Sequence, residues 1–207
     1  MERAAALLLM TLAASGCRAP TSAAAQTARA WGAGPAHWLL LPTDRDRMAR
    51  VETNTDFASF LAGFWACRDE DPGDDDNPFA RLFAERVAAA DRLYEEPGLR
   101  GSLTPRGGAL LLLGPPRFLR YSQRKAPTLE GTTTAGARPT RLLRVELWGY
   151  QPGDLPPALR ERLHAEAGSQ QEIALTFLVA RHTRLLEGGE LLELAANAAS
   201  HCQDEEP

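Results

Sequence analysis

The sequence lacks most of the patterns that mark catalytic, cofactor-binding or nucleic-acid-binding proteins. Lys125 is the only lysine and the formal net charge is −4, so the basic footprint of a nucleic-acid-binding protein is missing. No G-x-S-x-G, P-loop or G-x-G-x-x-G pattern occurs. The histidines are scattered, and none pairs with another histidine or a cysteine at metal-ligand spacing: His37, His164, His182 and His201. We therefore predict no catalytic residue, no cofactor, no metal site and no nucleic-acid partner.

A long apolar run is also missing, and the run that does occur lies at the N-terminus. Residues Ala4 to Ala14 are too few to span a bilayer but suit the core of a signal peptide. The run ends in Ala14-Ser15-Gly16-Cys17, which resembles the lipobox of bacterial lipoproteins, although the leucine common three places before the cysteine is Ala14 here. The resemblance implies a signal peptide over residues 1–16 and fatty acylation, such as palmitate, of Cys17.

A second interpretation of the same region remains open. Ala23-Ala24-Ala25 has the A-x-A form of an ordinary secretory cleavage site, and cleavage there would give a protein that begins at Gln26. The lipoprotein interpretation is favoured because the apolar core ends at the cysteine. In that interpretation Arg18 follows the acylated cysteine in place of aspartate, which by analogy favours the outer membrane where there are two membranes.

Beyond the signal, composition divides the chain into a tether, one domain and a tail. Residues 17–36 are rich in Ala, Thr, Ser and Gly with almost no large apolar side chain, so they are predicted to form a flexible tether. Residues 37–200 have the length and composition of a single domain. Residues 201–207 are predicted to be a polar tail.

The first half of the domain has helical periodicity. An aromatic stripe from Asp56 to Cys67 recurs at i, i+3, i+4, i+7 and i+8 and predicts a helix with one buried face. Asn77-Pro78 predicts the start of another, and Pro42-Thr43-Asp44 a short one with Thr43 as N-cap. Residues expected to share one core are Phe57, Phe60, Leu61, Phe64, Trp65, Phe79, Phe83, Val87 and Leu110 to Leu113.

The stretch from Arg100 to Arg117 is predicted to lie at the centre of the fold. Gly107 and Gly108 precede the apolar run Ala109 to Leu113, and Gly114-Pro115-Pro116 ends it. A short apolar run between such stops is predicted to be a buried strand.

The second half has the alternation of strands. Leu143, Val145 and Leu147 alternate with polar residues and are predicted to face the core. A long loop is expected over Ser122 to Pro139, a short helix over Pro156 to Ala167 and a strand over Glu172 to Ala180. The C-terminal segment is compatible with a hairpin around Glu187-Gly188-Gly189 or with a helix from Glu190 to Ala199. The expected class is α+β, with N-terminal helices packed on a small, mainly antiparallel sheet.

Motifs in this order resemble the GWxTD-domain family of exported bacterial proteins. The resemblance covers about Trp38 to Val179 and rests on Trp38-Leu39-Leu40, Phe64-Trp65, Arg68-Asp69, Asn77, Phe79, Leu113-Gly114-Pro115-Pro116 and Glu146-Leu147-Trp148 with Tyr150. The motif that names the family falls at Gly101-Ser102-Leu103-Thr104-Pro105, where only Gly101 and Thr104 match. The family implies export and fold, and no particular activity.

Two functions from different classes follow from these observations. The favoured one is a non-enzymatic envelope lipoprotein that binds the membrane through its lipid and contacts an envelope protein or polymer. Its candidate interaction surface is Arg106, Arg117, Arg120 and Trp148, which we expect to line one cleft. The alternative is a hydrolase or other enzyme of envelope polymers, with carboxylates such as Asp91, Glu95 or Glu146 as acid and base.

Two smaller expectations concern acidic residues and cysteines. The acidic run Asp69 to Asp76 does not have EF-hand spacing and is predicted to be a solvated loop without calcium. Export leaves Cys67 and Cys202 as a possible pair in an oxidising compartment. Cys67 lies on an apolar helix face and Cys202 in a polar tail, so we predict no disulfide between them.

Overall fold

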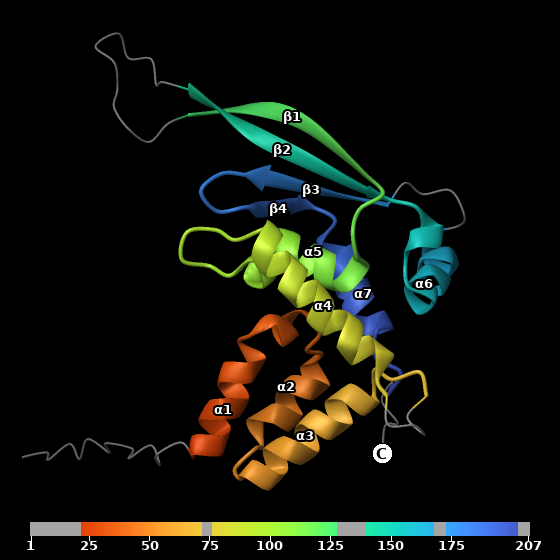
Figure 1. The fold of residues 1–207 in the computed structure, drawn as a ribbon. Coiled ribbons are helices and arrows are strands. Elements are labelled where there is room, and N and C mark those ends of the chain that lie inside the picture. The colour runs from red at the N-terminus through yellow and green to blue at the C-terminus, as the bar shows by residue number, and fades with distance from the viewer. Residues whose placement is uncertain (1–21, 72–75, 128–139, 168–172, 203–207) are drawn as a thin grey trace, which may run out of the picture.

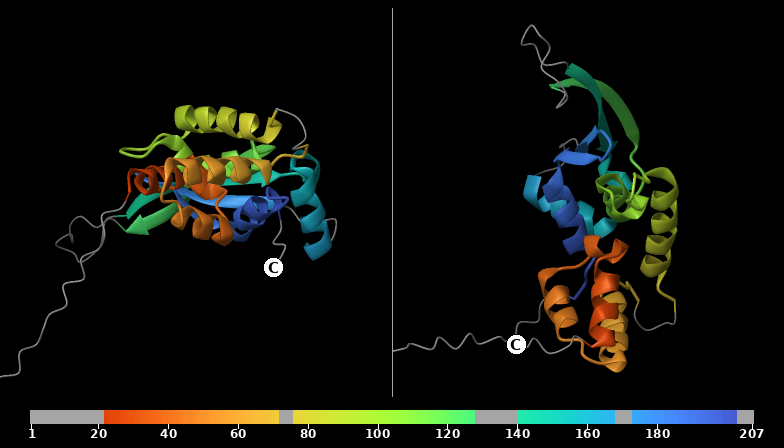
Figure 2. Two further views of the ribbon diagram at one scale, coloured as in Figure 1. Left: turned by 90° about the horizontal axis from the view of Figure 1, so that it is seen from below. Right: turned by 90° about the vertical axis from the view of Figure 1, so that its left-hand side faces the viewer.

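The computed structural model describes residues 22–71, 76–127, 140–167 and 173–202, and it has the predicted α+β class. Helices dominate the N-terminal half and an antiparallel four-stranded sheet the C-terminal half (Figure 1). Helices α1 to α3 form one end of the molecule, α4, α5 and α7 its middle, and the sheet the other end (Figures 1 and 2).

Helix α1 (Ala23–Gly32) lies inside the segment predicted to be a flexible tether, so that prediction is wrong for these residues. Ser22 caps the helix by accepting the N–H of Ala25 at 3.0 Å. The helix buries small side chains, Ala24 and Ala28, against its neighbours. Its one large apolar residue, Trp31, contacts the rings of Phe57, Phe60 and Phe64 edge-on. The segment has few large apolar residues and was therefore predicted to be flexible, but it forms a helix whose buried contacts are made mainly by alanine.

In each of the next two helices an aspartate in the first turn accepts the backbone N–H of the N-cap residue. Helix α2 (Pro42–Ala49) starts two residues earlier than predicted, with Leu41 rather than Thr43 as N-cap, and the Leu41 N–H donates to Asp44. Helix α3 (Asn54–Ala66) carries the predicted aromatic stripe and is confirmed. A reciprocal pair of hydrogen bonds between Thr53 and Asp56 fixes its start. A 3-10 turn, η1 (Pro35–Trp38), joins α1 to α2.

Helix α4 (Pro78–Leu93) begins as predicted, with Asn77 as N-cap and Pro78 in the first turn. The Asn77 side chain accepts the N–H of Ala80 at 2.7 Å and donates to the carbonyl of Trp65 at 3.0 Å. One side chain therefore caps α4 and fixes it to the end of α3.

The apolar run at the centre of the fold is a helix, α5 (Pro105–Leu113), so the predicted buried strand is wrong. Thr104 caps it by accepting the N–H of Gly107 at 3.1 Å, and Pro105 stands at the first position. Every residue from Gly107 to Leu113 is buried, because neighbouring elements surround this helix on all sides. A helix that is apolar all round shows no periodicity, and the run Ala109 to Leu113 is as short as a buried strand. Gly114, with φ of 81°, ends it.

The sheet has the order β1-β2-β3-β4, with every neighbouring pair antiparallel. Its strands are β1 (Phe118–Pro127), β2 (Thr140–Tyr150), β3 (Ile173–Val179) and β4 (Arg184–Glu187). β1 includes the first part of the segment predicted to be a loop; residues 128–139 of that segment lie outside the described residues. Of β2, only Arg144 to Tyr150 pairs with β3, so Thr140 to Leu143 and their partners Arg124 to Pro127 of β1 form a two-stranded ribbon.

The face of β2 that packs on the helices is the opposite of the predicted one. Trp148 pairs with Leu175 and Glu146 pairs with Phe177, and paired residues share a face. These side chains are buried, whereas Leu143, Val145 and Leu147 point to the side of the sheet that no described helix covers (Figures 1 and 2).

The remaining elements close the fold. The predicted short helix is α6 (Pro157–Ala167), preceded by a 3-10 turn, η3 (Pro152–Asp154). The open alternative at the C-terminus is decided in favour of a helix, α7 (Gly189–Ala198). The predicted core is confirmed as one cluster that joins both halves of the chain.

Candidate functional site

Two of the four candidate surface residues, Arg106 and Trp148, meet at a buried carboxylate. Arg106 Nη1 lies 3.6 Å from Glu146 Oε1, and Arg144 Nη2 lies 2.8 Å from the same oxygen. Trp148 Nε1 donates to Glu146 Oε2 at 3.2 Å. Both oxygens of this carboxylate are therefore occupied by protein groups, and Trp148, only 1% exposed, is part of the core.

Arg106 also faces a second buried carboxylate, that of Glu96. Arg106 Nη2 lies 3.7 Å from Glu96 Oε1, and the Thr183 N–H donates to both oxygens of Glu96 at 3.0 and 3.1 Å. His182 Nδ1 approaches from the surface at 3.5 Å. We call these three residues the Glu96–Arg106–Glu146 cluster; it joins the segment after α4, the start of α5, strand β2 and the β3–β4 turn. Buried charges need such partners, so the cluster fixes the sheet on the helices.

The other two candidate residues lie elsewhere, so the expected single cleft does not form. Arg117 is exposed, and its backbone N–H donates to the carbonyl of Gly149 at 2.9 Å. The guanidinium of Arg120 is exposed and lies over the ring of Phe118, 4.9 Å from its centroid. Arg106 and Trp148 are thus structural, and Arg117 and Arg120 are surface residues.

The carboxylates named for the enzymatic alternative do not form an acid–base pair. Asp91 accepts the Ser102 N–H at 2.8 Å and forms an ion pair with Arg100. Burial alone would raise the pKa of Asp91, but the hydrogen bonds from Ser102 and the pairing with Arg100 outweigh it and hold the pKa below its usual value. Glu95 is exposed. Glu146 is buried, and both of its oxygens contact protein groups.

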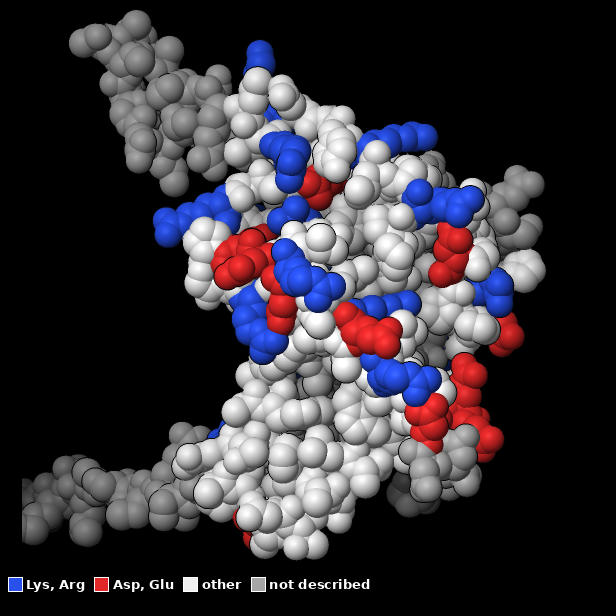
Figure 3. Space-filling model, viewed as in Figure 1, with Lys and Arg blue, Asp and Glu red and all other residues white. Residues whose placement is uncertain are grey.

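Strands β1 and β2, with the segment that joins them, are the most basic part of the chain. Residues 117–150 contain seven Arg and Lys against two acidic residues, whereas the remainder has sixteen against twenty-five. Figure 3 shows Arg and Lys side chains over the end of the molecule formed by β1 and β2, while this face of α1 to α3 shows few charges. Arg120, Arg124 and Lys125 are exposed, and no ion pair joins them to another described residue.

The side of the sheet away from the helices combines these cations with apolar side chains. The register places Arg120 and Arg124 of β1 opposite Leu147 and Leu143 of β2, with all four on this side. We call it the outer sheet face; it comprises Arg120, Ser122, Arg124, Leu143, Val145, Leu147, Thr176, Leu178, Arg184 and Glu187. Its leucines and valine are half-buried among themselves, and its arginines, on β1 and β4, border them on both sides.

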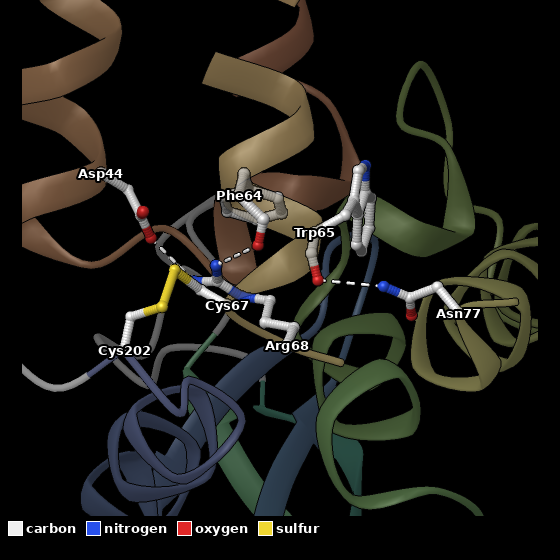
Figure 4. The surroundings of a disulfide bond; sticks show 7 residues. All are labelled: Asp44, Phe64, Trp65, Cys67, Arg68, Asn77 and Cys202. Atoms are coloured by element: carbon white, nitrogen blue, oxygen red, sulfur yellow. Dashed lines mark hydrogen bonds and ion pairs between the residues drawn. A yellow bond between two sulfur atoms is a disulfide. The ribbon is translucent and has the colours of Figure 1, made fainter. Parts of the chain in front are cut away.

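A disulfide joins Cys67 and Cys202, contrary to the prediction (Figure 4). The Cys67 carbonyl at the end of α3 accepts the His201 N–H at 2.7 Å, which brings the segment after α7 beside α3 and places the two Cα atoms 5.0 Å apart. The segment assigned to a polar tail therefore docks at its start. The sequence signal that could have found the pair is the export signal, which leaves two cysteines when Cys17 is acylated.

Other sequence predictions fall partly or wholly outside the described residues. Cys17 and the signal peptide lie there, as do residues 72–75 of the acidic run. Among the residues that the structure describes, no group of three or more His, Cys, Asp or Glu could hold a metal ion. No helix in the described ranges is long and apolar enough to cross a membrane.

Comparisons with protein-family models, with curated proteins and with solved structures find no match. The resemblance to the GWxTD-domain family therefore stays a prediction.

Proposed function

We propose that the protein is a membrane-anchored lipoprotein of the bacterial cell envelope, of the GWxTD-like kind, that acts as a non-enzymatic interaction module. The observation that carries the proposal is the distribution of its three cysteines. Cys67 and Cys202 form a disulfide, which suits an oxidising compartment outside the cytosol. Cys17, at the end of an apolar signal-like run, is the cysteine left for acylation.

The outer sheet face is the surface that best fits a partner. Uncovered apolar side chains bordered by cations on an otherwise acidic protein suit an acidic envelope protein or polymer. Helix α1, the first described element after Cys17, lies at the opposite end of the molecule from β1 and β2 (Figures 1 and 2). A lipid at Cys17 would thus hold α1 to α3 near the membrane, and the outer sheet face, at the far end of the molecule, would point away from it. The expected location is the outer membrane.

The anchor is tested with Cys17→Ala. We expect this variant to lose labelling by radioactive palmitate and to move from the detergent phase to the aqueous phase, because acyl chains supply the membrane affinity. The double variant Cys67→Ser with Cys202→Ser is the control and should keep its label. If the native protein begins at Gln26 and carries no fatty acid, the ordinary secretory interpretation holds and the anchor is refuted.

The interaction surface is tested by photocrosslinking in envelope preparations. A photoreactive residue in place of Arg124, on the outer sheet face, should give one discrete adduct that the double variant Arg120→Glu with Arg184→Glu abolishes. The same residue in place of Arg160, exposed on α6, is the matched control. Equal adducts from both positions would show that the outer sheet face has no specific partner.

A further inference from the structure

A cavity of about 370 Å³ lies between α4, α5, α7 and the segment that leads into α6. Most of its lining is apolar, with Phe79 and Leu82 from α4, Leu111 and Leu112 from α5, and Leu155 and Ala195 opposite them. This volume is within the range of small-molecule sites. None of the residues predicted from the sequence as a functional surface lines it.

The wall of α7 is fixed in place by covalent and polar contacts. His201, which follows α7 and lines the cavity, donates its backbone N–H to Cys67 at 2.7 Å, and the next residue forms the disulfide. Arg68, a further lining residue, is held by Asp44 at 2.7 Å and by the carbonyls of Leu39 and Phe64. The cavity is therefore bounded by an ordered frame on this side.

Arg86 is the cation in the lining whose charge is not balanced. Its Nη1 donates to the carbonyl of Leu111 at 2.9 Å, which occupies one of the free carbonyls at the end of α5. No carboxylate among the described residues pairs with it, and its Nε and Nη2 have no acceptor there. Burial lowers the pKa of this guanidinium, and the nearby Tyr150 partly raises it. Arg68, in contrast, has Asp44 as its counter-ion.

The remaining charged residues of the lining, Glu70 and Asp154, are exposed. Solvent screens them, so they contribute little to the field beside a half-buried guanidinium. An apolar cavity with one unbalanced cation is complementary to a molecule with an apolar body and one negative charge. A carboxylate matches the free Nε–Nη2 edge of Arg86 by accepting two parallel hydrogen bonds.

We propose that this cavity binds a small amphiphile with an apolar body and a single carboxylate head, which pairs with Arg86. The apolar body lies against the leucine and alanine side chains of α5 and α7. This site is separate from the outer sheet face and does not depend on the lipid at Cys17.

The test is calorimetric titration of the full chain carrying Cys17→Ser, so that no acyl group competes, with dodecanoate as the probe. We expect saturable binding at one site and weaker binding of dodecanol and dodecyltrimethylammonium. Arg86→Gln should weaken dodecanoate binding about tenfold or more, because a hydrogen-bonded charge pair is lost, and leave dodecanol binding unchanged. Arg92→Gln, exposed on the same helix and outside the cavity, is the matched control.

A second variant keeps the proposal testable if Arg86→Gln fails to fold, since Arg86 also caps α5. Ala158→Leu, at a half-exposed position in the first turn of α6, fills part of the cavity and should weaken binding of both dodecanoate and dodecanol. Absent or non-saturable dodecanoate binding, equal binding to the Arg86→Gln protein, or no effect of Ala158→Leu would each overturn the proposal. Palmitate labelling at Cys17 reports separately on the anchor.

Discussion

A buried arginine organises the junction between the N-terminal helices and the rest of the protein. The guanidinium of Arg68 lies 3.7 Å from the centroid of the Phe64 ring, donates to the carbonyls of Phe64 and Leu39 and pairs with Asp44. Burial lowers the pKa of Arg68 and the Asp44 carboxylate partly restores it. A buried charge is tolerated only with such partners, so this contact specifies how α2 and α3 meet.

Phe64 is the apolar centre of the same junction and should be among the most sensitive positions. It is 0% exposed and contacts Trp31 and Trp65 with ring centroids 5.0 Å away in each case. Truncation in Phe64→Ala should lower the free energy of unfolding by about 3–5 kcal/mol, since it removes buried area and leaves a cavity. Chemical denaturation measures this. Leu93→Ala, at a residue that is 63% exposed, is the control. Identical midpoints for the two variants would contradict the helical core.

Asp91 should make stability depend on pH at the acidic end. Its pKa is lowered in the folded state, so its contribution is present above the usual carboxyl pKa of about 3.9 and is lost as pH falls through the lower folded value. Asp91→Asn should thus be less stable than the native protein at pH 7, and the difference should shrink progressively below about pH 4. Thermal melts across this range measure it. Glu95→Gln is the control for the loss of one negative charge, and a difference independent of pH would contradict the assignment.

At the scale of elements, the helices that could be predicted from the sequence are those with one buried face and a recognisable N-cap residue. Helices α3 and α4 have both features, because an aromatic stripe follows Thr53 or Asn77. α5 has no polar face, so its periodicity is hidden, and only Thr104-Pro105 marked its start. The outer face of β2 carries Leu143, Val145 and Leu147, whereas the inner one carries Arg144 and Glu146 beside Trp148 and Tyr150. Hydropathy therefore favoured the outer face. The inner face can be buried because Arg106, from the start of α5, pairs with Glu146, and the sequence does not show that contact.

Helix α5 requires glycine where it approaches the turn before it. A Cβ on Gly107 would lie 1.9 Å from the Gly101 carbonyl oxygen, a backbone atom that no side-chain rotation can move. Gly107→Ala should therefore destabilise the protein by about 1–3 kcal/mol or more, despite the better helix propensity of alanine. Gly153→Ala is the matched control, since a Cβ there has nothing within 4 Å. Equal melting temperatures would refute this close approach.

At the scale of the whole molecule, the division of the chain was only partly predictable. The α+β class followed from the order of helical and alternating segments, whereas the ordered α1 and the disulfide did not. Both depend on contacts between residues far apart in the sequence, such as Trp31 with Phe64 and His201 with Cys67. The candidate surface was split for the same reason, since the Glu96–Arg106–Glu146 cluster draws Arg106 into the core.

The disulfide should account for a large share of the stability. It joins residues 135 positions apart, and a loop of this size restricts the unfolded chain by about 4–5 kcal/mol in the chain-entropy description. The double variant Cys67→Ser with Cys202→Ser should lose about this much free energy of unfolding. Reductant should destabilise the native protein and leave the double variant unaffected. If the denaturation midpoint of the native protein is the same with and without reductant, the prediction is contradicted.

The same bond turns α4 to α7 and all four strands into a covalent ring, with α1 to α3 attached outside it. One peptide-bond cleavage anywhere between residues 68 and 201 opens the ring without dividing the molecule. The two pieces stay joined through sulfur and migrate as one species until a reductant separates them. A nicked copy therefore keeps its sheet attached to its N-terminal helices, and a second cut in the ring is needed before any fragment is lost.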